Sequence, residues 1–298
     1  MVRVAYYGEE GSYSEEGARR YFGNKGDFMP CGTFSAVIKM TGKGADYGVM
    51  PVENSIEGTV SQAYDLIASS RLSVVGEVKL RVKHELIANK GVSIKDVRYV
   101  YSHQQALGQC ARYIDRKGFI ALPFHDTAGS VRMLKEKGYR DSAAIASGRA
   151  ARIYNMDILD RAIETDKRNY TRFLVVGKKA AAPAGECKTS IVFRIKHVAG
   201  SLYKAIGCFA NNGINLTYIQ SRPAAGRPWE YSFFVDMDLF LGHGRQPFEI
   251  VIKNFRVCLC VLFWAFFVWR CIFRVCGKRT RMHSYYLRAQ TLRYSNKA

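Results

Sequence analysis

The stretch Tyr47-Gly-Val-Met-Pro-Val-Glu-Asn-Ser-Ile-Glu-Gly-Thr59 runs from a short apolar segment into a polar, glycine-bearing turn. Beyond it, Val60, Ala63, Tyr64 and Ile67 recur at the spacing of one helix face. An apolar run that ends in a polar turn and precedes a helical pattern is typical of an α/β unit. We therefore predict a strand, a turn and a helix in this order.

Apolar runs of the same kind recur through the first 177 residues, and four of them precede a helical pattern. The predicted strands are Val2–Tyr7, Tyr47–Val52, Val97–Tyr101, Phe119–Pro123, Ala143–Ala146 and Phe173–Val176. This alternation favours an α/β domain with a largely parallel sheet. A small-residue linker at 177–185 separates that domain from a shorter second unit.

Polar caps stand at the start of the predicted helices. Ser102 caps one of them, and Asp126 or Thr127 caps the next. Helix N-termini leave N–H donors free for anions, and ligands of open α/β sheets bind at the carboxyl ends of the strands. The sequence lacks the glycine-rich nucleotide motifs and the zinc-protease helix. These patterns predict a metal-free site for a small anion, whereas any one such turn alone would be ordinary in an α/β protein.

The positive charge is unevenly distributed along the chain. The 298 residues carry a formal charge of +20, and half of it follows Glu249, the last acidic residue. Before that point no Lys/Arg cluster is interleaved with aromatic residues, so we expect no nucleic-acid partner. The tail, 241–298, is rich in Cys and Trp without a zinc spacing. Its uncharged run Val257–Trp269 is short for a membrane span, so membrane binding is not expected. The sequence begins with a strand-like run, which favours the cytoplasm over export.

Six motifs in the first domain together carry a resemblance to a known family. They are Gly8-x-x-Gly-Ser-Tyr-Ser14, Pro51-Val-Glu-Asn-Ser-x-x-Gly-x-Val60, Ser102-His-x-Gln-Ala-Leu-x-Gln-Cys110, Asp126-Thr-Ala-Gly-Ser130, Ala143-Ala-Ile-Ala-Ser147 and Asn169-x-Thr-Arg-Phe173. In this order, they make residues 1–177 resemble the catalytic domain of prephenate dehydratase. The resemblance implies two α/β lobes, similar to periplasmic binding proteins, with the site in the cleft between them.

The resemblance also implies a reaction and its residues. A lyase of this family converts prephenate to phenylpyruvate, CO2 and water in phenylalanine biosynthesis, and it needs no cofactor. Thr171 would give a proton to the leaving hydroxyl, and Arg172 would bind a substrate carboxylate or position the site; Glu53 and Asn54 complete the expected catalytic set. The expected substrate-binding residues are Ser12, Ser55, Ser102, Gln109, Asp126, Thr127, Asn169 and Phe173.

The second unit, 186–240, resembles an ACT regulatory domain of βαββαβ order. The residues implied in binding phenylalanine as an effector are Gly200, Ser201, Leu202, Gln220, Ser221, Arg222 and Pro223. Glutamine at position 220 stands where the family has glutamate, which removes a charge from that motif. The chain continues into the atypical tail, so the last helix and strand are expected to be missing. Domains of this type pair, and the resemblance implies a homodimer or homotetramer.

Two other functions stay open on the sequence. Arogenate dehydratase acts on a substrate that carries an amino group in place of the keto oxygen, and the motifs do not separate it from prephenate dehydratase. A non-catalytic module that binds an amino acid would share the fold. The Asn169-x-Thr-Arg-Phe173 motif favours an enzyme, since a binding module has no use for a proton donor.

Overall fold

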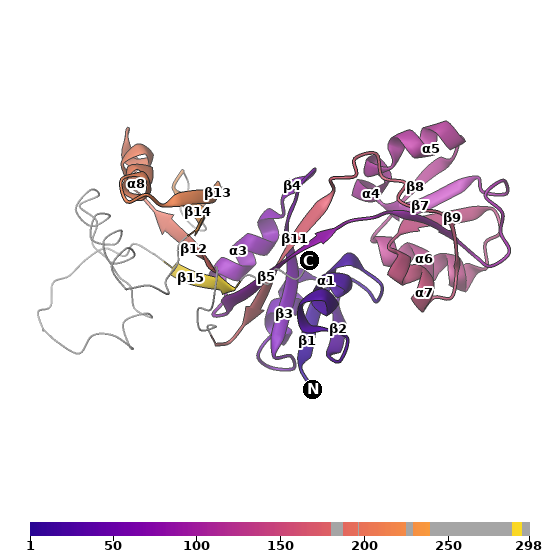
Figure 1. The fold of residues 1–298 in the computed structure, drawn as a ribbon, viewed down its shortest axis with the longest axis horizontal. Helices are drawn as coiled ribbons and strands as arrows, with labels where there is room; N and C mark the ends of the chain where they lie inside the picture. Colours follow the sequence, from indigo (N-terminus) through magenta and orange to yellow (C-terminus); the bar gives the residue numbers. More distant parts are fainter. Residues whose placement is uncertain (180–186, 196, 225–228, 239–287, 294–298) are drawn as a thin grey trace, which may run out of the picture. The chain divides into compact units, whose positions relative to one another are not determined.

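The computed structural model describes residues 1–179, 187–195, 197–224, 229–238 and 288–293. The chain divides into two compact units. The first comprises Met1–Ser73 and Glu77–Lys179, and the second comprises Val74–Gly76 and the residues from Ala180 onward. Figure 1 labels most of the strands and helices of both units.

The first unit begins with a mixed sheet in the order β2-β1-β3-β11-β5, to whose β3 the short β4 is added; of β5, residues Val74–Gly76 are counted with the second unit. Its strands are β1 (Arg3–Tyr7), β2 (Asp27–Cys31), β3 (Tyr47–Asn54), β4 (Gly58–Thr59), β5 (Ser73–Arg81) and β11 (Tyr170–Gly177). The helices between them are α1 (Tyr13–Phe22), α2 (Phe34–Met40) and α3 (Ser61–Ser69). Strand β1 runs parallel to β2 and β3, whereas β11, which comes last in this unit, runs antiparallel to β3.

A second sheet of the same unit has the order β10-β6-β9-β7-β8. Its strands are β6 (Glu85–Ala88), β7 (Tyr99–His103), β8 (Ile120–Phe124), β9 (Ser142–Ala146) and β10 (Asp157–Asp160). The accompanying helices are α4 (Gln104–Gln109), α5 (Ala111–Lys117), α6 (Thr127–Lys137) and α7 (Gly148–Ile153). Strand β9 is buried along its whole length, which explains its run of small and aliphatic residues.

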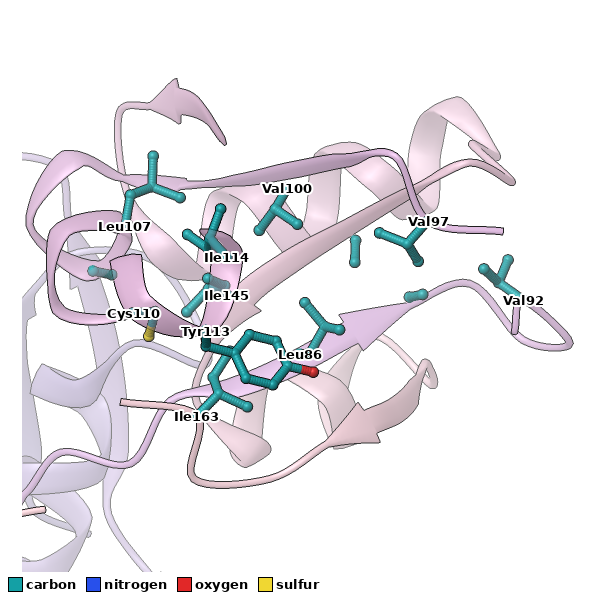
Figure 2. Close-up of a cluster of buried hydrophobic side chains, with 13 residues drawn as sticks. Leu86, Val92, Val97, Val100, Leu107, Cys110, Tyr113, Ile114, Ile145 and Ile163 are labelled. Carbon is teal, nitrogen blue, oxygen red and sulfur yellow. The ribbon is translucent and has the colours of Figure 1, made fainter. Parts of the chain in front are cut away.

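Apolar side chains cover both faces of this second sheet. One cluster joins Leu86, Val100 and Ile145 from the strands to Tyr113 and Ile114 of α5 (Figure 2). A second cluster brings alternate strand residues against α6 and α7. Because neighbouring residues of a strand point to opposite faces, the two clusters together bury the sheet.

The two sheets are joined by two chain crossings, one between β5 and β6 and one between β10 and β11. The crossings touch where the Val82 N–H donates to the Asn169 carbonyl over 2.8 Å. Elsewhere the Ser147 hydroxyl donates to the Gly11 carbonyl over 2.6 Å. Gly11 has φ +87°, and a Cβ there would lie 2.8 Å from Cα of Ala150, so only glycine fits this contact.

The structure contains all six predicted strands of the first domain but corrects the prediction of one largely parallel sheet. There are two mixed sheets, because β11 pairs antiparallel with β3 and β6 pairs antiparallel with β9. Five strands of this unit were not predicted, namely β2, β4, β5, β6 and β10. Strand β2 contains Pro30 and lies at a sheet edge, where a missing N–H costs little.

The second unit contains an antiparallel sheet of order β13-β14-β12-β15 with a helix, α8. The elements are β12 (Cys187–Arg194), α8 (Ser201–Ala210), β13 (Asn215–Pro223), β14 (Tyr231–Asp238) and β15 (Arg288–Arg293). Phe193 of β12, Phe209 of α8 and Val235 of β14 share one buried cluster.

Strand β15 corrects the expectation that the final strand would be missing. Residues 288–293, within the atypical tail, pair antiparallel with β12 from Cys187↔Arg293 to Val192↔Arg288. Residues 239–287, which hold the apolar run Val257–Trp269, lie outside the described part of the chain. Among the residues that are described, no helix is long and apolar enough to cross a membrane.

Candidate active site

Thr171 and Asn54 face each other across the pairing of β11 with β3. The Nδ2 of Asn54 donates to the Thr171 hydroxyl oxygen over 3.0 Å. Both side chains are half-buried at the end of β3, where the polar turn begins. The pairing register therefore brings together two residues 117 positions apart in the sequence.

Asn54 is held rigidly by four hydrogen bonds. Its Oδ1 accepts from the backbone N–H groups of Ile56 and Glu57, each over 3.0 Å. Its Nδ2 donates to Asn169 Oδ1 over 2.7 Å as well as to Thr171. An asparagine amide has two donors and one acceptor oxygen with two lone pairs, so all of its hydrogen-bonding capacity is used. The Asn54 amide is therefore fully engaged within the protein, and one of its bonds fixes the Thr171 hydroxyl oxygen.

The hydrogen-bond chain continues from Asn169 to α4. The fully buried Asn169 donates from Nδ2 to Gln109 Oε1 over 2.7 Å. The backbone carbonyl of Gln109 accepts from the backbone N–H of Thr165 over 2.9 Å. The structure thus joins Asn54, Gln109, Asn169 and Thr171 in one chain of hydrogen bonds.

Two residues that were not predicted as site residues extend this chain of hydrogen bonds. The Nε2 of His84 lies 2.8 Å from Gln109 Oε1, and its Nδ1 lies 2.9 Å from the hydroxyl of Tyr13. Burial lowers the pKa of His84 and raises that of Tyr13, so both are neutral near pH 7. Tyr13 lies inside the first quoted motif, but His84 is a lone histidine in a strand-like context, which gives little signal by itself.

Ser55 closes the turn after β3. Its hydroxyl donates to the Arg168 carbonyl over 2.8 Å and accepts from the Tyr170 N–H over 2.9 Å. A backbone bond from Ser55 N–H to the Tyr170 carbonyl, 2.8 Å long, adds to this closure. Both oxygen roles of the Ser55 hydroxyl serve the backbone, which makes it a support for the turn.

Arg172 lies on the opposite side of β11 from Thr171, as the alternation of a strand requires. Its buried guanidinium donates to Glu77 Oε2 over 2.8 Å and to Glu53 Oε2 over 3.3 Å. The Tyr64 hydroxyl of α3 lies 3.3 Å from Nη1. Of the two roles expected for Arg172, this geometry supports positioning of the strand, with Glu53 as one of its partners.

Five of the expected substrate-binding residues are placed apart from the Thr171 chain of hydrogen bonds. Ser102 is fully buried, and its hydroxyl donates to the Ile145 carbonyl over 2.5 Å. Phe173 is buried against α1 at Gly17. Ser12 and Asp126 cap the N-termini of α1 and α6, and Thr127 is the first residue of α6.

One group of side chains in the described part of the chain has the composition of a cation site. Ligand atoms of Glu9, His125 and Asp126 lie within 4.8 Å of one another. Arg132 already donates to Glu9 Oε1 over 2.8 Å, which places a positive charge where a cation would sit. The group is therefore satisfied by an ion pair.

The second unit contains a cavity of about 580 Å³ beside the N-terminus of α8. Four of the seven expected effector residues line it: Gly200, Ser201, Leu202 and Ser221. The rest of the wall comprises Ile195, His197, Val198, Ala199, Tyr203, Tyr231 and Phe233. Gln220 instead accepts a hydrogen bond from the Tyr218 hydroxyl, and Arg222 and Pro223 are not among the lining residues.

Comparison with known proteins decides the family. The family model described as prephenate dehydratase matches residues 4–181, which contain every residue of the Thr171 chain. The chain belongs to the prephenate dehydratase family. The resemblance that the six motifs predicted is thereby confirmed.

The curated relatives of this chain include plant and bacterial enzymes of the prephenate dehydratase family. A chloroplastic arogenate dehydratase/prephenate dehydratase of Arabidopsis thaliana is 39% identical over 249 residues, covering 80% of this chain and 65% of the relative. A bifunctional chorismate mutase/prephenate dehydratase of Aquifex aeolicus is 38% identical over 248 residues, covering 82% of this chain and 67% of the relative. The chain thus spans about two thirds of the length of these relatives.

Solved structures show the same fold. Prephenate dehydratase of Arthrobacter aurescens in complex with L-Phe is 26% identical with a TM-score of 0.78, covering 87% of both chains. A structure described as the quorum-quenching acylase GqqA is 29% identical with a TM-score of 0.78, covering 85% of this chain and 92% of that one. The α/β fold predicted for the catalytic domain is that of prephenate dehydratase structures.

Proposed function

We propose that this chain catalyses the conversion of prephenate to phenylpyruvate, CO2 and water. Family membership supports the proposal, and so does the set of uncharged donors that surrounds Thr171.

The reaction divides into two bond cleavages that aromatise the ring. The bond between the ring and its carboxylate breaks, and its electron pair enters the ring as CO2 departs. The carbon–oxygen bond at the opposite ring position breaks, and the departing oxygen takes up a proton to leave as water. Formation of the aromatic ring drives both steps, so the protein has to supply orientation and a proton.

The observation that carries the proposal is the state of the Thr171 hydroxyl. Its oxygen accepts from Asn54 Nδ2 over 3.0 Å, and it donates to no other described residue. A hydroxyl has one proton to donate, and here that proton is free for the leaving oxygen of the substrate. Donation from Asn54 also disperses negative charge that develops on the threonine oxygen as its proton moves.

Gln109 supplies a donor for a substrate carboxylate. Its Oε1 is occupied by Asn169 and His84, so the amide nitrogen points away from them. That nitrogen lies 3.5 Å from Glu57 Oε1, a long contact to an exposed side chain. A substrate carboxylate can replace Glu57 as the acceptor at little cost, because an exposed contact of this length is weak.

The two sheets of the first unit support a two-lobed catalytic domain over 1–177, with the substrate bound between the lobes. The second unit supports an ACT-like domain, since β12, α8, β13, β14 and β15 follow the expected order apart from the undescribed segment 239–287. The boundary at 186–240 then extends to include 288–293, with the remainder of 241–298 as a tail.

Phenylalanine is the proposed effector of the second unit. The A. aurescens structure was determined with L-Phe, and the cavity beside α8 is lined largely by apolar and aromatic side chains. A homodimer or homotetramer remains the proposed assembly, on the resemblance alone. A cytoplasmic location also remains a prediction from the sequence. The Arabidopsis relative is described as chloroplastic, so the comparison does not support that location for this chain.

Arogenate is the second candidate substrate, because the relative with 39% identity bears both activities in its name. The test is to incubate the purified chain with prephenate and separately with arogenate, following phenylpyruvate and phenylalanine. Formation of phenylpyruvate from prephenate supports the proposal. Turnover of arogenate alone would replace it with the second candidate, and turnover of neither would contradict a catalytic function.

A further inference from the structure

The hydrogen bonds around Thr171 have a fixed direction because they start on the backbone. The two N–H groups that follow Asn54 in the turn can only donate, so Asn54 must turn its oxygen toward them. Its nitrogen then faces Asn169, which must present its own oxygen. Asn169 therefore turns its nitrogen toward Gln109, and Gln109 must present its oxygen in return.

This direction determines the state of His84. Its Nε2 lies 2.8 Å from the same Gln109 Oε1, so Nε2 carries a proton and donates. Burial lowers the pKa of the imidazole, which keeps the ring neutral and leaves Nδ1 without a proton. Nδ1 lies 2.9 Å from the Tyr13 hydroxyl, whose single proton also reaches the Lys83 carbonyl 2.8 Å away, so Nδ1 shares that proton as an acceptor. The chain of donors thus converges on Gln109 from both sides.

We propose that His84 is a positioning residue, which holds the Gln109 side chain with its amide nitrogen directed to a carboxylate of the substrate. This inference rests on the proposed function. The ring comes from the crossing between β5 and β6, whereas Gln109 ends α4 and Tyr13 begins α1. His84 is 2% exposed, so its role is exerted through Gln109 rather than by substrate contact.

Without His84, only Asn169 would hold the Gln109 oxygen, and the amide could rotate to present its oxygen to an anion. A misdirected amide weakens substrate binding in the ground state and the transition state alike, so the main effect falls on KM. We expect His84→Ala to lower kcat/KM roughly 10- to 100-fold, with most of the change in KM. His84→Gln should recover most of this loss, because its amide nitrogen can donate to Gln109.

Tyr113→Phe is the matched control. It removes a buried tyrosine hydroxyl that donates to Asp160 over 2.8 Å, outside the Thr171 chain. Its kcat/KM should stay within about twofold of the wild type, whereas Tyr13→Phe should fall between the control and His84→Ala. An His84→Ala enzyme that behaves like the Tyr113→Phe control would overturn the proposal.

A double-mutant cycle separates action through Gln109 from a general effect on folding. The His84→Ala/Gln109→Ala enzyme should be no worse than Gln109→Ala alone, since both changes remove the same donor to the substrate. If the loss of kcat/KM in the double variant equals the product of the two single losses, action through Gln109 is contradicted.

A measurement without substrate keeps this inference distinct from the proposed function. In 15N-labelled wild-type protein, long-range 1H–15N spectra should show His84 as the neutral Nε2–H tautomer, and Gln109→Ala should alter its shifts. An Nδ1–H tautomer, or a ring charged at pH 7, would overturn the inference. Wild-type protein with the expected tautomer but no turnover would instead contradict the proposed function.

Discussion

The amide nitrogen of Asn54 lies 3.0 Å from the hydroxyl oxygen of Thr171, across paired strands of an antiparallel ladder. The second proton of that amide goes to Asn169, 2.7 Å away. Asn54 is thus the branch point that connects the expected proton donor to the hydrogen bonds of Asn169, Gln109 and His84. It determines which way each of these groups points.

Asn54→Asp should impair catalysis by redirecting the Thr171 proton. Aspartate keeps the acceptor for the turn N–H groups but replaces the donor nitrogen with a second oxygen. The Thr171 hydroxyl would then donate to the introduced carboxylate rather than to the substrate. We expect kcat to fall by about 100-fold or more in steady-state assays.

Ser55→Ala is the comparison for that variant, since it removes a different support of the same turn. In the wild type, the Ser55 hydroxyl contacts the Arg168 carbonyl and the Tyr170 N–H, not Thr171. A smaller loss of kcat than in Asn54→Asp is expected. Equal losses would show that the turn as a whole matters and that the Asn54 donor has no special role.

Arg172→Met should reduce stability strongly. The guanidinium lies 2.8 Å from Glu77, and the two side chains are 8% and 2% exposed. Removing one partner of a buried ion pair leaves the other charge in a poorly solvated place, which costs about 3–5 kcal/mol. Urea denaturation of the purified variant measures this change in the free energy of unfolding.

Arg168→Met is the matched surface change. Arg168 pairs with Asp166 over 3.1 Å, but the two side chains are 88% and 41% exposed. Solvent screens exposed pairs, which contribute little to stability, so this variant should unfold close to the wild type. An Arg172→Met protein as stable as Arg168→Met would refute the structural role given to Arg172.

Protonation of His84 should lower the free energy of unfolding in mild acid. Burial lowers its pKa in the folded protein, so the unfolded chain binds a proton there more readily near pH 6.5, about the ordinary histidine value. The contribution to stability is present above about pH 6.5 and is lost as the pH falls below it.

His84→Gln removes that titration while keeping a donor to Gln109. The difference in free energy of unfolding between wild type and His84→Gln should therefore shrink as the pH falls from 8 to 5. Urea titrations of both proteins across this range test it. A constant difference would contradict a lowered pKa for His84.

Ser221→Trp should weaken phenylalanine binding by filling the cavity of the second unit. Ser221 is one of its lining residues, and its side chain is exposed to that space. We expect the Kd for phenylalanine to rise more than about tenfold by calorimetry, because the indole occupies the room for the ligand ring.

Ile219→Trp controls for a bulky residue on the same strand. Ile219 is 45% exposed on β13 but is not among the residues that line the cavity. Its Kd for phenylalanine should stay close to that of the wild type. Loss of binding in both variants would argue against the cavity as the effector site.

The motifs allowed candidate site residues to be selected because their spacing reports local turns. The Glu53-Asn54-Ser55 turn and Thr171 could be selected from their motifs. Ser102 was selected in the same way as a substrate-binding residue. A serine that caps a helix in sequence can equally donate to a neighbouring strand, as Ser102 does to Ile145.

Long-range pairing explains what the sequence could not predict. His84 belongs to the site only because two chain crossings meet at Val82 and Asn169, and no local pattern records that contact. Strand β15 was likewise unexpected, since its antiparallel partner, β12, lies about a hundred residues earlier in the chain. The cap of α6 at Asp126 was predictable because a cap depends on neighbouring residues, whereas α4 is capped by His103 and not by the predicted Ser102.

Turnover of prephenate by the wild type and by Thr171→Val tests the central claim most directly. Valine keeps the shape of threonine but has no hydroxyl, and Thr171→Ser restores the hydroxyl as a control. We predict phenylpyruvate formation by the wild type, a fall in kcat of about 100-fold or more in Thr171→Val, and substantial activity in Thr171→Ser. A Thr171→Val enzyme with near-normal kcat would contradict the assignment of Thr171 as the proton donor.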